Sequence, residues 1–258
     1  GPTIALPPTP REIFDIFFSD DILEGICTET NRYAQSTMSA TQYATFEKIT
    51  SDEIRAYLGF SILMSVVVLP SIGDYWSNDR NLHYSPIAGK ITRQRYQTIS
   101  RYWHFVDNTT LKSRGHINYD RLGKVRPVLE KVNSKFQSSY KPHREVSIDE
   151  AMIKFQGRSC LKQYVPIKPI KRGIKSWVLA DSHNGYFHTV KVHSMCGNTN
   201  VKYLTTLIVY PIHRSMLGKK TGKLQKSLEK KLCWICYPHC MVYTIMHILT
   251  TSSQLLIW

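Results

Sequence analysis

The chain has 258 residues and carries 34 Lys and Arg against 19 Asp and Glu, a formal net charge of +15. This length is enough for a sizeable hydrophobic core. The basic balance favours nucleic acid as a partner, ahead of a ribosome-like protein, a membrane-surface protein or merely a basic surface. The longest apolar stretch, near 62–70, is too short to span a bilayer, and the number and spacing of the six cysteines do not resemble a secreted disulfide framework. These features exclude a membrane-spanning protein and a disulfide scaffold, and they favour a reducing compartment.

The first 140 residues are predicted to be largely α-helical. Thr50 and Glu53 fit a capping box, in which the hydroxyl and the carboxylate accept hydrogen bonds from free amides at a helix start. The helix that follows is expected to bury Ile54, Tyr57 and Leu58. Helical apolar spacing also occurs in segments 11–18, 22–34, 92–105 and 121–140.

The segment 92–105 carries three arginines, Arg93, Arg95 and Arg101, that we expect to be available to solvent or to phosphate. A packed helix with a solvated basic face would show the same pattern. The segment is therefore a helix by either interpretation, and its charge alone does not separate the two.

From Glu145 the pattern changes to strands. Residues 146–155 alternate apolar and polar side chains, and residues 177–180 and 186–192 are rich in β-forming types. Between the last two runs, residues 181–185 read DSHNG, which predicts a hairpin turn because Asn and Gly tolerate a positive φ.

The predicted fold class is α+β, with three regions. A largely helical N-terminal region covers 1–140, the first strands of an α/β domain cover 141–215, and a tail of uncertain fold covers 216–258.

Asp149 is the first candidate for a metal ligand. It stands in a strand that the alternation predicts to be buried, and a buried carboxylate is costly unless it is ion-paired or bound to a metal ion. An ion-paired structural carboxylate is the alternative interpretation.

A basic strip follows Asp149. From Ala151 to Ala180 there are seven basic residues and no acidic one, which suits a surface that tracks phosphates. Lysines that protect a strand edge would look similar. Tyr164 and Trp177, within the same stretch, can stack on bases, although packing is the ordinary role of such residues. The predicted nucleic-acid-binding residues are Lys154, Arg158, Lys162, Lys168, Lys171, Arg172 and Lys175.

The tail contains Cys233, Cys236 and Cys240, with His239 and His247 nearby. Three cysteines and a histidine can bind zinc tetrahedrally. Their spacing lacks the paired form of a zinc finger, so we favour an accidental cluster over a zinc site.

Two adjacent motifs resemble the signature of piggyBac transposases. Residues 147–159 read SIDEAMIKFQGRS and residues 161–175 read LKQYVPIKPIKRGIK. Segments 95–108 and 121–127 are also similar to this family. The resemblance implies an RNase H-like catalytic domain preceded by a helical region for dimerisation and DNA binding. It also implies double-stranded DNA as partner, namely transposon terminal repeats, a possible homodimer and residence in the nucleus.

In that family three aspartates hold two Mg²⁺ ions for strand cleavage and transfer, and Asp149 matches the first of them. We therefore assign Asp149 as the catalytic and metal residue, and expect Glu150 to point to the opposite face of the strand. The second aspartate is expected within 242–257, but the chain has no Asp after Asp181. Mg²⁺ is therefore not expected to bind productively.

We expect a transposase-derived protein that binds DNA and is catalytically incomplete. Two alternatives remain. The chain is a fragment of an active DDE-type transposase, or it is an interaction remnant that dimerises with intact transposase.

Overall fold

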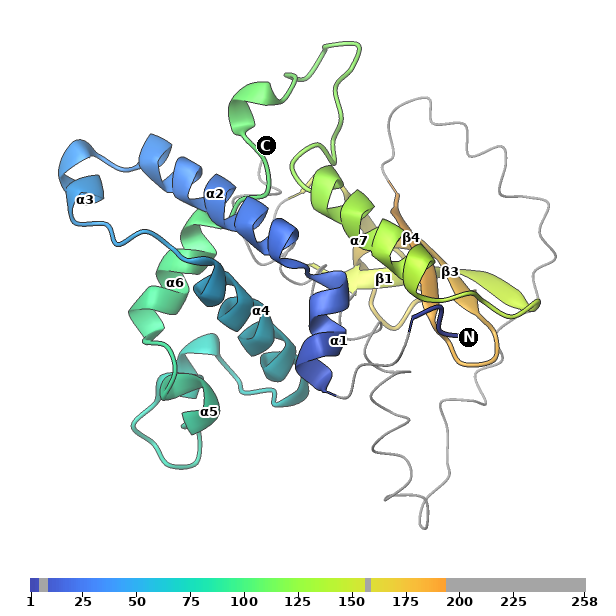
Figure 1. The fold of residues 1–258 in the computed structure, drawn as a ribbon, viewed down its shortest axis with the longest axis horizontal. Helices are drawn as coiled ribbons and strands as arrows, with labels where there is room; N and C mark the ends of the chain where they lie inside the picture. The colour runs from blue at the N-terminus through green and yellow to red at the C-terminus, as the bar shows by residue number, and fades with distance from the viewer. Residues whose placement is uncertain (5–8, 156–158, 194–258) are drawn as a thin grey trace. The chain divides into compact units, whose positions relative to one another are not determined.

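The computed structural model describes residues 1–4, 9–155 and 159–193, and the chain divides into two compact units. Among these residues, the first unit contains 1–17, 131–155 and 161–193, and the second contains 18–130 with 159–160. The helices precede an antiparallel sheet, so the predicted α+β class is confirmed (Figure 1). Within the described ranges, no helix has the length and apolar character needed to cross a bilayer.

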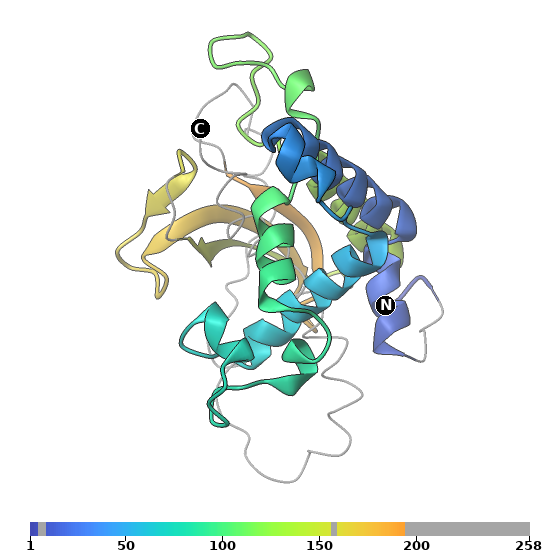
Figure 2. The ribbon, with the colours of Figure 1, turned by 90° about the vertical axis from the view of Figure 1, so that its left-hand side faces the viewer.

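The second unit is helical, and in it α2 packs against α4 and α6 (Figure 2). The helix α4 begins as predicted, because the Thr50 hydroxyl accepts from the Glu53 N–H at 3.3 Å and the Glu53 carboxylate accepts from the Thr50 N–H at 3.0 Å. The elements are α2 (Asp20–Thr37), α3 (Ala40–Ala44), α4 (Ser51–Val66), η1 (Ile72–Trp76), α5 (Ser85–Ala88), α6 (Arg93–Tyr102) and η2 (Asn108–Thr110).

An aromatic stack forms the centre of this helical unit. The ring of Tyr57 stacks on Tyr96 and on Trp103, with centroid distances of 4.9 and 4.7 Å. Tyr57, Ile54 and Leu58 are buried on one face of α4, as their spacing predicts. Burial of such large side chains supplies most of the stability of a helical bundle.

The first unit is built on the sheet, in which β3 pairs antiparallel with β1 along one side and with β2 and β4 along the other. The three-residue strand β2 is absent from the sequence prediction. The elements are α1 (Pro10–Phe17), the greater part of α7 (Arg126–Ser139), β1 (Val146–Lys154), β2 (Lys162–Tyr164), β3 (Arg172–Asp181) and β4 (Phe187–Val192).

The helix predicted over 121–140 is shorter than expected, because α7 begins only at Arg126. Residues just before it form turns, in which the Asp120 carboxylate accepts from the Leu122 N–H at 2.9 Å. The same carboxylate is ion-paired with Arg126. This local hydrogen bonding competes with a helical conformation and delays the start of the helix.

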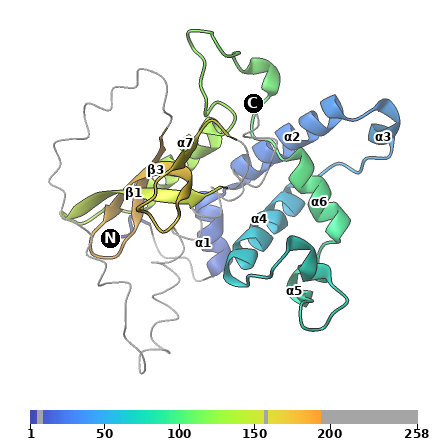
Figure 3. The same cartoon turned by 180° about the vertical axis from the view of Figure 1, so that it is seen from behind.

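The helix α7 lies across one face of the sheet, in front of it in Figure 1 and behind it in Figure 3. Its Asn133 side chain donates to the Val190 carbonyl at 2.8 Å and accepts from the Val190 N–H at 2.9 Å, which satisfies both backbone groups of this residue of β4. The hairpin turn between β3 and β4 is confirmed, with Gly185 at φ +74° and the Asp181 carboxylate accepting from the His183 N–H at 2.8 Å.

Candidate nucleic-acid interface

Four of the seven residues of the basic strip line one open groove of about 610 Å³ in the sheet unit. The groove lies at the end of β1, along β2 and at the start of β3. No acidic side chain is among the described residues that line it, and four of them are cations. The lining residues are Lys154, Phe155, Lys162, Tyr164, Pro169, Ile170, Lys171 and Arg172.

The hairpin from β2 to β3 positions these cations. Lys162 pairs with Ile174 and Tyr164 with Arg172 in the strand register. The Val165 N–H donates to the Lys171 carbonyl at 2.8 Å and closes the loop between the strands. Side chains that are far apart along the loop therefore meet at one groove.

A glycine permits the close approach of β1 and β3 beside the groove. A Cβ atom added to Gly173 would stand 2.1 Å from the Ile153 carbonyl oxygen, which is far inside a van der Waals contact. Because the atom it would meet is backbone in a paired strand, no side-chain rotation can relieve the clash.

Tyr164 is exposed over 61% of its surface, and the Arg172 guanidinium carbon lies 5.5 Å from the centroid of its ring. This distance is within the range of a cation–π interaction. The groove therefore presents an aromatic ring together with four cations.

Two other members of the basic strip gather around Glu150 instead. The Lys175 ammonium lies 2.6 Å from the Glu150 carboxylate and 4.8 Å from the Trp177 ring centroid. The Lys168 ammonium donates to the Glu150 carbonyl at 3.3 Å. The charge of Lys175 is thus compensated by the Glu150 carboxylate, whereas Lys168 contacts only the backbone of Glu150. Arg158, the remaining member, lies outside the described residues, as do Cys233, Cys236 and Cys240.

Asp149 is an exposed residue, which corrects the expectation that its side chain is buried. Its carboxylate accepts a hydrogen bond of 2.7 Å from the Glu150 N–H. Among the described strands β1 pairs with β3 only.

The carboxylates near Asp149 in the sequence do not complete a site for two metal ions. Glu150 is bound to Lys175. Throughout the portion of the chain that is described, no three His, Cys, Asp or Glu side chains are placed to hold a metal ion together. The described residues therefore do not fit a two-metal centre, which needs several carboxylates in contact with the ions.

Asp181 has a structural role rather than a role as a ligand. It is buried, and its carboxylate accepts from the Tyr140 hydroxyl at 3.1 Å, from the His143 ring at 2.7 Å and from the His143 N–H at 3.0 Å. Burial alone would raise its pKa, but these hydrogen bonds outweigh that effect and lower the pKa to about 2. The lone pairs of the Asp181 carboxylate are therefore already occupied by these hydrogen bonds.

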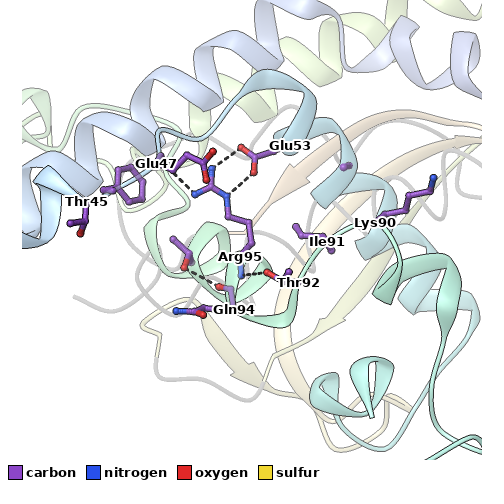
Figure 4. A pocket seen from close by; sticks show the side chains of 11 residues that line it. Thr45, Glu47, Glu53, Lys90, Ile91, Thr92, Gln94 and Arg95 are labelled. Carbon is purple, nitrogen blue, oxygen red and sulfur yellow. Dashed lines mark hydrogen bonds and ion pairs between the residues drawn. The ribbon is translucent and has the colours of Figure 1, made fainter. Parts of the chain in front are cut away.

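A second hollow, of about 530 Å³, lies in the helical unit (Figure 4). At its wall the Arg95 guanidinium donates to both Glu53 oxygens at 2.6 and 2.8 Å, to the Glu47 carbonyl at 2.8 Å and to the Lys48 carbonyl at 3.1 Å. Arg95 is therefore committed to internal contacts, so the expectation that it is available to phosphate is wrong. Partial burial alone would raise the pKa of Glu53, but hydrogen bonds from Arg95 and Thr50 lower it.

Comparison with known proteins identifies the family. A family model described as Transposase IS4 matches residues 9–210, which is more than half of the chain. The chain is 31% identical over 170 residues to human PiggyBac transposable element-derived protein 2, covering 66% of this chain and 27% of that protein. It is 26% identical over 233 residues to human PiggyBac transposable element-derived protein 5, covering 85% of this chain and 43% of that protein.

The fold has a counterpart among solved structures. A cryo-EM structure of a piggyBac transposase synaptic complex with hairpin DNA matches with a TM-score of 0.68 and 23% identity, covering 92% of this chain and 45% of that one. The chain thus spans less than half the length of these proteins. The family match, the relatives and the shared fold agree, and the chain belongs to the piggyBac family of transposases and transposable element-derived proteins.

Proposed function

We propose that this chain binds double-stranded DNA through the groove formed by β1, β2 and β3. The observation that carries the proposal is the convergence of Lys154, Lys162, Lys171 and Arg172 on a groove without acidic lining. Cations gathered in this way displace the counterions of DNA, and the net charge of +15 adds a long-range attraction. The related structure is a complex with DNA, which supports the same class of partner. The proposal includes transposon terminal repeats as the DNA that is bound and the nucleus as the compartment in which binding takes place.

We also propose that the chain alone does not cleave DNA strands. Transposase relatives suggest the use of a divalent metal ion, and Asp149 would be the residue that contacts it. A single exposed carboxylate binds Mg²⁺ weakly, because the ion keeps most of its hydration shell. Asp149 would therefore act only together with carboxylates that the described residues do not bring to it.

The binding proposal can be tested by charge reversal. With a labelled duplex of transposon-end sequence at low salt, Lys162→Glu with Lys171→Glu is expected to weaken the affinity at least about tenfold, because two phosphate contacts become repulsive. The matched control combines Lys191→Glu on β4 with Lys141→Glu, both exposed residues of the same unit that lie outside the groove. Equal weakening in both double variants would contradict binding at the groove.

The catalytic proposal needs a separate assay. Plasmid or oligonucleotide DNA carrying a terminal repeat is incubated with the chain and Mg²⁺ or Mn²⁺, and strand breaks are resolved on a denaturing gel. We expect no specific nicking. Specific nicks that disappear in Asp149→Asn would overturn the proposal and would place a working metal centre at Asp149.

A further inference from the structure

Tyr164 differs from the aromatic residues that build the two units. Tyr57, Trp103 and Tyr186 are almost fully buried, whereas Tyr164 is 61% exposed at the wall of the groove. Exposed aromatic surface has no packing role, and beside several cations it forms the combination that proteins use to hold unpaired nucleobases.

The β2–β3 hairpin places the ring beside Arg172. Tyr164 lies in β2 in register with Arg172 of β3, and the guanidinium lies 5.5 Å from the ring centroid. The connecting loop is closed by the hydrogen bond from Val165 to Lys171 and contains Pro166 and Pro169, whose rings restrict φ. A stacking surface ordered in this way loses little conformational entropy on binding.

We propose that Tyr164 and Arg172 form a platform for one unpaired nucleobase, while Lys154, Lys162 and Lys171 contact the adjoining phosphates. The bases of an intact duplex are stacked on one another and cannot offer a face to the ring. The groove therefore selects DNA that carries an unpaired base over fully paired duplex. This inference rests on the proposed DNA-binding function and specifies its substrate class.

The test uses the full chain and two DNAs that differ at a single position. One is a fully paired duplex containing 2-aminopurine, and the other carries the same 2-aminopurine as an unpaired base. The parent chain is expected to bind the second DNA about tenfold more tightly, as for one stacked base, and to quench the fluorescence of its 2-aminopurine. Both effects report on stacking rather than on charge.

Three variants separate stacking from charge and from folding. Tyr164→Ala is expected to lose the quenching and to bind the two DNAs with similar affinity, and Tyr164→Phe is expected to retain both the preference and the quenching. Ile167→Ala is the control, because Ile167 is 94% exposed in the same loop but does not line the groove. Circular dichroism spectra confirm that each variant is folded.

Equal affinity of the parent for both DNAs, or equal losses on both in Tyr164→Ala, would overturn the platform. Duplex binding that still responds to Lys162→Glu with Lys171→Glu would then leave the proposed function standing. Absence of binding to either DNA would overturn both proposals.

Discussion

At the scale of single residues, Gly173 sets the distance between β1 and β3 at the groove. A Cβ atom there would lie 2.1 Å from the Ile153 carbonyl oxygen. We expect Gly173→Ala to lower the stability of the sheet unit by about 1–3 kcal/mol, since the strands must separate to admit the methyl group. Thermal unfolding followed by circular dichroism measures the change.

The matched control for this substitution is Gly59→Ala in α4, where an added Cβ meets nothing within 4 Å. Alanine is the better helix former, so that variant should be unchanged or gain up to about 1 kcal/mol. A similar loss in both variants would show that the close approach at Gly173 is not the cause.

His104 makes the helical unit sensitive to acid. The ring is buried, stacks on Tyr33 at 3.6 Å and lies 3.2 Å from the Asn108 amide, while its Nδ1 has no hydrogen-bond partner among the described residues. Burial, with a smaller effect from nearby Lys124, lowers its pKa from 6.5 to about 4.

The imidazole of His104 takes up a proton at a higher pH in the unfolded chain than in the folded one. The stability that neutral His104 contributes is therefore present above pH 6.5 and is lost as the pH falls toward 4. We expect a loss of about 2 kcal/mol between pH 7 and pH 5, seen as a falling melting temperature. His104→Gln should flatten this dependence, and His116→Gln, in an exposed loop, should not. An unchanged slope in His104→Gln would refute the assignment.

At the scale of elements, Glu53 joins the start of α4 to α6. Its carboxylate completes the capping box with Thr50 and accepts hydrogen bonds from Nε and Nη2 of Arg95. Glu53→Ala should therefore lower stability by about 2–3 kcal/mol, combining the loss of a helix cap with the loss of charged hydrogen bonds.

Glu53→Gln separates the two contributions, because its amide oxygen can still accept from the Thr50 N–H. We expect an intermediate stability for it, measured by urea unfolding of the three proteins. Glu24→Ala, at an exposed position of α2, is the control and should change stability little. If Glu53→Gln is destabilised as much as Glu53→Ala, the ion pair with Arg95 alone accounts for the loss of stability.

At the scale of the whole molecule, the excess of positive charge governs the response to salt. The logarithm of DNA affinity should fall linearly with the logarithm of salt concentration, with a slope of about −0.9 for each phosphate contacted. Lys171→Ala should make the slope shallower by about 1 and Lys191→Ala should leave it unchanged. Binding titrations over a series of salt concentrations give the slopes, and equal slopes in both variants would exclude Lys171 from contact.

Much of the fold follows from local signals in the sequence. The capping box at Thr50, the apolar face of α4 and the turn before Gly185 each depend on residues a few positions apart. The strand β2 escapes prediction because its three residues, Lys162–Tyr164, have no apolar alternation and form a strand only by pairing with β3. The start of α7 is misplaced because apolar spacing continues through the turns that precede it.

By itself the sequence determined the α+β class, the family resemblance around Asp149 and the basic strip that follows it. Only the tertiary structure decided how that strip divides, with Lys154, Lys162, Lys171 and Arg172 at a groove and Lys168 and Lys175 at Glu150. It also decided that Asp149 is exposed and that Arg95 belongs to Glu53, 42 residues away. Strand register and ion pairing join distant residues, and a local pattern carries no information about either.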